Sequence, residues 1–434
     1  MIAVIGAGPA GLSAAVTAAK NGESVILIDS SSRLGGQYWR HLPGAWNDDN
    51  KYHYNFDKAQ KLFNEVLGNS LITWYSNAHV WQGEKRDKTF HLFVIRNGVE
   101  EVVLADKVIL ATGAYDRALP FPGWTNPGVM TPGGAQSMLK SHGVVVGNRV
   151  VIAGTGPFLL PVAAGLIDAG AKVVGLFEAN KPWRWILNIH GLLLNPSKIG
   201  EAIYYFRKLR RAQVQLRYGK RVESFEAGFV TVDGNRIACD AVAVGWGFVP
   251  DLSLAGILGA KLKVARDGTT VVAVDTHQQT SVEGLFAAGE STGIGGSSLS
   301  IIEGRIAASG NGKFARFRAQ VFARGLQRVY PVSDSWQSLV KPETILCRCE
   351  EVSMGDVISA VEDLGAEDAR TAKLFTRAGM GLCQGRMCAR NVGELVACHL
   401  SLEVTDSERI NYSQRPLAGP ISLGELGDGL GKDF

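Results

Sequence analysis

Cysteine is missing from the first 238 of the 434 residues, and the six cysteines that follow are unevenly spaced. Four of them form two close pairs, whereas a secreted disulfide framework would spread its cysteines along the chain. This distribution favours thiols that ligate a metal in a reducing compartment, and therefore a cytoplasmic protein. The two pairs are Cys347 with Cys349 and Cys383 with Cys388.

A strong charge of one sign and a long uninterrupted apolar segment are also missing. Lys and Arg number 45 against 41 Asp and Glu, and the formal net charge of +4 argues against nucleic acid as a partner. The N-terminal apolar run is broken at Gly6, too early for a signal peptide. The longest apolar stretch, residues 150–167, contains a Gly-Thr-Gly-Pro break. We therefore expect no transmembrane segment.

Glycine, by contrast, is abundant, with 52 residues, and its first cluster has a spacing typical of dinucleotide binding. Gly6 allows a tight turn, Gly8 lets the backbone approach a diphosphate, and Gly11 lets the following helix pack against the preceding strand. The next apolar run ends at Asp29, whose carboxylate can accept hydrogen bonds from an adenosine ribose. The order of strand, loop, helix, strand and acid predicts a Rossmann-like unit. Its candidate nucleotide-binding residues are Gly6, Gly8, Pro9, Ala10, Gly11 and Asp29.

A second glycine cluster predicts another unit of the same kind. Gly154 and Gly156 follow an apolar run, and the next apolar run ends at Glu178. A carboxylate at this position favours NAD over NADP, because it would repel a 2′-phosphate. Leu159, however, stands where the third glycine is expected. Three alternatives stay open at this site: NAD, another adenine nucleotide, or no nucleotide.

Three further segments resemble the flavin-binding segments of the two-dinucleotide-domain flavoprotein reductases. They are Leu34-Gly35-Gly36-Gln37, Val108-Ile109-Leu110-Ala111-Thr112-Gly113 and Gly284-Leu285-Phe286-Ala287-Ala288-Gly289-Glu290. The resemblance implies FAD at the first site, with a carboxylate near the ribityl chain that is usually Asp and here is Glu290. The redox-active cysteine pair of the disulfide reductases in that superfamily is absent, which excludes their activity. The flavin contacts implied are Gly36, Gln37, Thr112, Gly113, Gly289 and Glu290.

The two cysteine pairs have CxC and CxxxxC spacing and are separated by 33 residues. Helices expected at residues 352–364 and 368–377 would bring them together as a hairpin. Four thiolates suit a [2Fe–2S] cluster or a structural zinc ion. Zinc sites more often use CxxC, and an electron carrier has a purpose beside a flavin, so the cluster is favoured. Arg348, Arg386 and Arg390 would offset its negative charge.

This cysteine region resembles the [2Fe–2S] domain of bacterioferritin-associated ferredoxin type. Its longer second spacing resembles the variant fused to flavoprotein subunits of opine oxidases, proline and hydroxyproline dehydrogenases, and hydrogen cyanide synthase. Thr292-Gly293-Ile294-Gly295-Gly296 and Glu303-Gly304-Arg305 add to this match. The resemblance implies an electron-transferring FAD and [2Fe–2S] subunit of a hetero-oligomer, whose flavin-containing companion subunit oxidises an amine or imino acid. It leaves the substrate, the stoichiometry and the electron acceptor open.

Two other functions are compatible with the same motifs. One is a self-sufficient NADH-dependent flavoprotein reductase, in which NADH at the second glycine loop delivers hydride to FAD. The other is a non-enzymatic scaffold whose second nucleotide is structural.

The expected fold class is α/β, with two Rossmann-like dinucleotide-binding domains, one inserted in the other, and a small helical [2Fe–2S] domain. The domain limits expected from the motifs run along the chain as a split flavin domain, an insert, a linker, the cluster domain and a tail that contacts this chain or a partner. These segments are residues 1–140 with 265–330, 141–264, 331–344, 345–400 and 401–434.

Overall fold

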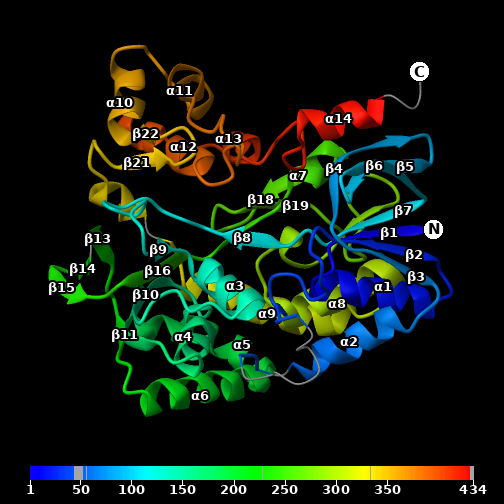
Figure 1. Ribbon diagram of the computed structural model, residues 1–434, viewed down its shortest axis with the longest axis horizontal. Coiled ribbons are helices and arrows are strands. Elements are labelled where there is room, and N and C mark those ends of the chain that lie inside the picture. Colours follow the sequence, from blue (N-terminus) through cyan, green and yellow to red (C-terminus); the bar gives the residue numbers. More distant parts are fainter. Residues whose placement is uncertain (44–51, 55, 227, 333, 431–434) are drawn as a thin grey trace.

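The computed structural model describes residues 1–43, 52–54, 56–226, 228–332 and 334–430. Figure 1 shows two units that are each built on a parallel sheet, and a third, mostly helical unit that contains α10, α11 and α12. The final segment returns from this third unit to the first one and ends in α14 (Leu423–Leu430). The predicted α/β fold class with a helical C-terminal domain is confirmed.

The first sheet is parallel throughout, and its strands are short apolar runs because both faces are covered. Its order is β20-β7-β1-β2-β3. Helices cover one face, and a three-stranded antiparallel sheet covers the other. The strands are β1 (Ile2–Ile5), β2 (Val25–Ile28), β3 (Ile72–Tyr75), β7 (Lys107–Leu110) and β20 (Leu285–Ala287). The covering elements are α1 (Pro9–Lys20), α2 (Asp57–Leu67) and α8 (Ser297–Ser309), and β4 (Ala78–Arg86), β5 (Thr89–Arg96) and β6 (Val99–Ala105).

Helices α1 and α8 pack closely where both carry small residues. A Cβ on Gly304 would lie 2.0 Å from the backbone oxygen of Ala10, so only glycine fits at this contact. The close packing brings α8, which lies almost 300 residues along the chain, against the helix that follows the first glycine loop.

The second sheet is also parallel, in the order β12-β11-β10-β16-β9. Helices lie on one face, and the other face shares a core with the antiparallel sheet β13–β15 and with the C-terminal domain. The strands are β9 (Val129–Met130), β10 (Arg149–Thr155), β11 (Lys172–Glu178), β12 (Leu216–Tyr218) and β16 (Ala241–Trp246). The other elements are α3 (Pro132–His142), α4 (Leu159–Asp168), α6 (Pro196–Arg211), β13 (Val222–Glu226), β14 (Phe229–Val232) and β15 (Asn235–Ala238).

The chain passes between the first two units at β8 (Ala114–Asp116) and β17 (Phe248–Pro250), which pair with each other antiparallel. Strand β9 and helix α3 precede residue 141 or begin before it, yet both pack within the second unit. We therefore propose that the insert is bounded by β8 and β17 rather than by residues 141 and 264.

Shorter elements connect or extend these sheets. Two helical segments, η1 (Pro182–Asn188) and α5 (Ile189–Leu194), precede α6 and pack against α9 (Lys313–Val329). The remaining connections are α7 (Ser253–Ile257), β18 (Leu262–Val264), β19 (Thr270–Val272), η2 (Gly289–Thr292) and η3 (Asp334–Leu339).

The C-terminal domain begins with a small β pair, β21 (Ile345–Cys347) with β22 (Val352–Ser353). Its helices α10 (Met354–Glu362) and α11 (Ala369–Thr376) lie within the two helical ranges predicted from the sequence, and α12 (Ala389–His399) follows the last cysteine pair. The tail carries α13 (Asp406–Asn411) and then reaches the first unit, where Ala418 N donates to Trp81 O at 2.8 Å. The described part of the tail thus packs on this chain. Among the described residues, no helix combines the length and apolar character needed to cross a bilayer.

Candidate functional site

The first glycine loop has the tight geometry that its spacing predicts. Gly6 has a φ of +104°, and a Cβ there would lie 2.3 Å from Ala111 O. A Cβ on Gly11 would lie 1.7 Å from Gly6 O. Helix α1 has Gly8 as its N-cap, with no side chain capping its first turn and no acidic residue in that turn. Its free N–H groups and partial positive charge are therefore suited to bind a diphosphate.

Asp29 is held at the end of β2 by its neighbours in this loop. One carboxylate oxygen accepts from Ala7 N at 2.5 Å, and the other accepts from Ser31 N at 2.7 Å. The residue is only half-buried, so the carboxylate keeps lone pairs that a ribose hydroxyl can reach.

Several glycines present bare backbone around this loop. A Cβ on Gly36 would lie 2.7 Å from Gly8 Cα, so the segment around Gly36 can pack on the first glycine loop only without a side chain there. Gly113, Gly293 and Gly296 all have positive φ, and no atom lies within 4 Å of the place where a Cβ would stand. We call the bare main chain at Gly8, Gly36, Gly113, Gly293 and Gly296 the cradle, because a ligand can approach the backbone closely where no side chain stands. FAD therefore fits the residues present.

The remaining implied flavin contacts have partners within the chain. Thr112 Oγ1 donates to Asp251 O at 2.7 Å, and Gln37 Oε1 accepts from Arg40 Nε at 3.0 Å. These bonds fix both side chains at the edge of the cradle.

Two glutamates shape the segment that leads into α8. Glu290 accepts from Gly296 N at 2.8 Å and from Gly295 N at 3.2 Å, and burial raises the pKa of its carboxyl to about 7. Glu303, 2% exposed, accepts from Gly289 N at 3.1 Å and from Thr292 Oγ1 at 2.9 Å. Glu303 was not among the predicted site residues. The sequence signal for it is the segment Glu303-Gly304-Arg305, which contributes to the family resemblance but was not assigned a role in the site.

The second glycine loop differs from the first in the burial and hydrogen bonding of the carboxylate that follows its second strand. Glu178 is 4% exposed, and its carboxylate accepts from Thr155 Oγ1 at 2.9 Å, Gly156 N at 3.0 Å and Asn180 N at 2.9 Å. The Asn180 side chain in turn donates to Pro331 O at 3.1 Å, so the chain beyond α9 lies over this network. Unlike Asp29, Glu178 is therefore engaged within the protein and shielded from a ribose.

The helix of this second unit also begins later than in the first unit. Helix α1 begins three residues after Gly6, whereas α4 begins five residues after Gly154, at Leu159. Leu159 is 3% exposed and contributes to the core of the second unit. Helix α4 thus starts two residues later, relative to the first glycine of its loop, than α1 does in the loop with three glycines.

The four candidate metal-ligating cysteines gather as two pairs. Cys347 and Cys388 are buried and in hydrogen-bonding contact, and Cys349 and Cys383, nearer the surface, contact each other. Gly379 N also donates to Cys347 Sγ at 3.4 Å. The hydrogen bond from Cys388 lowers the pKa of the Cys347 thiol to about 5.

The four thiols suit the cluster that the sequence favours. Cys388 interacts with Cys349 and Cys383 as well as with Cys347, so the two pairs lie close to each other. Four thiolates are the ligand set of a [2Fe–2S] cluster.

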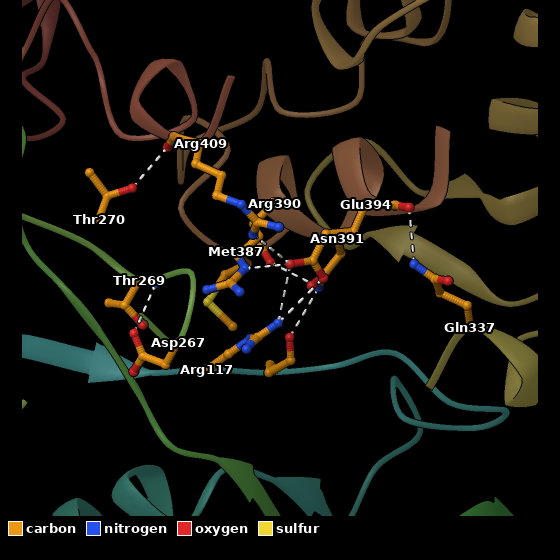
Figure 2. A network of polar contacts seen from close by, with 11 residues as sticks. Arg117, Asp267, Thr269, Thr270, Gln337, Met387, Arg390, Asn391, Glu394 and Arg409 are labelled. Atoms are coloured by element: carbon orange, nitrogen blue, oxygen red, sulfur yellow. Dashed lines mark hydrogen bonds and ion pairs between the residues drawn. The ribbon is translucent and has the colours of Figure 1, made fainter. Parts of the chain in front are cut away.

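A buried charge network joins the cysteine domain to the rest of the chain (Figure 2). Glu394 on α12 accepts from Arg390 Nε at 2.6 Å, Arg117 Nη2 at 3.3 Å and Arg409 Nη1 at 3.4 Å. Burial opposes ionisation of Glu394, but the three arginines outweigh it, so the pKa of this carboxyl lies below its ordinary value. Arg386, between Cys383 and Cys388, donates to Ser253 Oγ at 2.9 Å.

Comparison with known proteins gives two family matches and several relatives. Residues 1–312 match the pyridine nucleotide-disulphide oxidoreductase family, and residues 345–397 match the BFD-like [2Fe-2S] binding domain. An opine oxidase subunit from Agrobacterium tumefaciens is 33% identical, over 98% of this chain and 90% of that protein. Hydrogen cyanide synthase subunit HcnB of Pseudomonas protegens is 31% identical, over 89% of each chain.

Among solved structures, L-proline dehydrogenase from P. horikoshii superposes with a TM-score of 0.69 at 21% identity. The superposition covers 98% of this chain and 78% of that one. At this identity the likeness concerns the fold.

Proposed function

Because this chain belongs to the pyridine nucleotide-disulphide oxidoreductase family and also contains a BFD-like [2Fe-2S] binding domain, we propose that it is the electron-transferring subunit of a heteromeric amine or imino-acid dehydrogenase. The observation that carries the proposal is the presence, in one chain, of a glycine-lined nucleotide cradle and two thiol pairs. Relatives described as subunits of opine oxidase and hydrogen cyanide synthase support a hetero-oligomer.

We assign the first glycine loop to FAD, which supplies two-electron and one-electron redox chemistry when bound. The N-terminus of α1 at Gly8 would hold its diphosphate, and Asp29 would accept a ribose hydroxyl. Glu290 and Glu303 would act as positioning residues, because their carboxylates fix the backbone between η2 and α8.

We assign the four cysteines to a [2Fe–2S] cluster, which Cys347, Cys349, Cys383 and Cys388 would hold and which would supply one-electron transfer when bound. The buried pair faces the protein core, and the second pair lies towards solvent, where an electron can leave or enter. Arg386 and Arg390 lie within or next to the second cysteine motif and would offset the negative charge of four thiolates.

The companion subunit, in this proposal, contains its own flavin and oxidises the C–N bond of the substrate. The alternative, an NADH-dependent reductase, is less well supported because Glu178 is already engaged by Thr155, Gly156 and Asn180. We propose that the second nucleotide unit does not present NADH to the flavin.

The test uses the complex purified with its companion and compares C383S with C398S. Cys398 is exposed and has no ligand spacing to another cysteine, so it is the matched control. With C383S, the amine should still bleach the flavin of the companion, but reduction of a one-electron dye should fall at least about tenfold, while C398S keeps the wild-type rate. Amine oxidation by this chain alone, or equal dye reduction in both variants, would contradict the proposal.

A further inference from the structure

An unusual set of large apolar side chains stands in solvent on η1, α5 and α9. Ile186 is 71% exposed, Leu193 72% and Phe314 75%. We call this set the apolar face, and it consists of Trp183, Ile186, Leu187, Leu193, Phe314 and Phe317. Because η1 and α5 both pack against α9, these side chains stand on neighbouring elements, and exposed apolar residues gathered in this way mark an interaction site.

The apolar face is held in place by polar contacts on its inner side. Arg184 Nη2 donates to Arg328 O at 3.3 Å, and Asn195 Nδ2 donates to Arg318 O at 3.1 Å. Asn188, 2% exposed, donates to Phe322 O at 3.4 Å. The segment from η1 to α5 is therefore inverted, with polar groups directed inward to α9 and apolar groups outward. The outward residues cannot collapse onto the protein without breaking these bonds.

Glycine makes this inner contact possible. A Cβ on Gly325 would lie 1.7 Å from Asn188 Oδ1, and one on Gly191 would lie 2.9 Å from Phe322 Cα. The sequence thus supports the inverted arrangement at two separate positions.

The segments that carry the apolar face are rich in basic residues. Residues 181–211 and 313–329 contain twelve Lys and Arg and a single carboxylate, Glu201, although the whole chain has a net charge of only +4. Three of the twelve form ion pairs, Lys198 with Glu201, Lys208 with Asp168 and Arg316 with Glu303. Arg324 and Arg328 on α9 are exposed, so we expect an acidic rim on the surface that covers the apolar face.

The apolar face adjoins the elements that surround the proposed flavin site. Helix α9 packs against α8, and α5 packs against α6. The phenol of Tyr38, next to Gln37, hydrogen-bonds Ser297 at the start of α8 and lies near Glu201 of α6, and burial raises its pKa. A partner on the apolar face would thus lie beside the flavin-binding unit, where electrons must arrive.

We propose that the apolar face is the docking surface for the amine-oxidising companion subunit, which presents an apolar patch with an acidic rim. This inference rests on the proposed function, which requires such a subunit. The inference adds the place on this chain where the companion subunit binds, and the apolar and acidic character of the surface that it presents. Arg318, next to Phe317 in the sequence, donates to Leu194 O at 2.6 Å and so ties α9 to α5 within the face.

The experiment compares two double variants of the full chain, tagged and expressed in its native host. L193D/F314D places two carboxylates on the apolar face. L364D/L402D is the matched control on the C-terminal domain, where the two leucines are 57% and 60% exposed. Complex formation is measured by size-exclusion chromatography with flavin stoichiometry and amine-dependent dye reduction. Hydrogen exchange of residues 182–194 and 313–321 is compared between the free chain and the complex.

The wild type and L364D/L402D should co-elute with the companion, and L193D/F314D should lose at least about 90% of it while keeping its own flavin and iron. Residues 182–194 and 313–321 should exchange more slowly in the complex. Retention of the companion by L193D/F314D would overturn the inference, as would binding of the wild type to phosphatidylglycerol vesicles that this variant alone abolishes. If the wild type yields no amine-active complex at all, the proposed function fails instead.

Discussion

Arg117 and Glu394 form a buried ion pair at 3.3 Å across 277 residues of sequence, and both side chains are less than a tenth exposed. Arg117 follows β8, at one of the two chain crossings between the sheet units, and Glu394 lies on α12, the helix that follows Cys388. The Glu394 carboxylate thus links the cluster domain to the segment after β8, where the chain passes between the two sheet units (Figure 2).

Replacing this carboxylate should loosen the cluster domain. E394Q leaves three arginines around a neutral amide, and loss of one partner of a buried ion pair costs about 3–5 kcal/mol. We expect a lower denaturant midpoint and faster proteolysis between residues 334 and 345. The control is E362Q, because Glu362 is 59% exposed and its contact with His399 lies at the surface. Equal stability of the two variants would show that Glu394 does not hold the domain.

The first glycine loop should lose its flavin when Gly11 gains a methyl group. The Cβ of G11A would lie 1.7 Å from Gly6 O, so the loop must open and α1 must shift. We expect purified G11A to retain less than about a tenth of the wild-type flavin by absorbance. G256A is the matched control, because Gly256 is helical and has no atom within 4 Å of a Cβ position. Full flavin content in G11A would place FAD elsewhere.

Lys140 should make the stability of the chain depend on pH. It is 5% exposed on α3, its Nζ lies 3.4 Å from His53 Nδ1, and burial lowers its pKa to about 7. The unfolded chain therefore binds one more proton than the folded chain between pH 7 and about 10, so stability rises with pH across this window. K140M should flatten this rise and melt about 2–4 °C higher at pH 6.5. Parallel melting curves of K140M and wild type from pH 6.5 to 9 would contradict this.

The parts of the fold that depend on neighbouring residues could be predicted from the sequence. The turn at Gly6, the strand ends at Asp29 and Glu178, and the helices between the cysteine pairs follow from local spacing. The engagement of Glu178 by Asn180 could not be predicted, because a terminal acid has the same sequence pattern whether it faces ligand or protein. Contacts such as Glu303 with Gly289, or Arg117 with Glu394, depend on tertiary packing that no local pattern encodes.

Tertiary packing also explains why the proposed limits of the insert differ from those predicted from the sequence. The sequence places the second unit at its glycine loop, but β9 joins its sheet from upstream by pairing of Val129 with Val242, and α3 packs in its core. A two-residue strand leaves no periodic signal. Packing therefore supports an insert that both begins and ends earlier than the motifs predict.

The most direct test of the proposed electron-transfer role is an anaerobic absorption spectrum of the purified chain, with iron and acid-labile sulfide assays, before and after NADH is added. We expect flavin, about two irons per chain, and no bleaching by NADH, since Glu178 is held within the protein. Zinc without iron would contradict the assignment of the cysteines. Rapid bleaching by NADH would make the chain a reductase in its own right rather than a subunit that receives electrons from a companion.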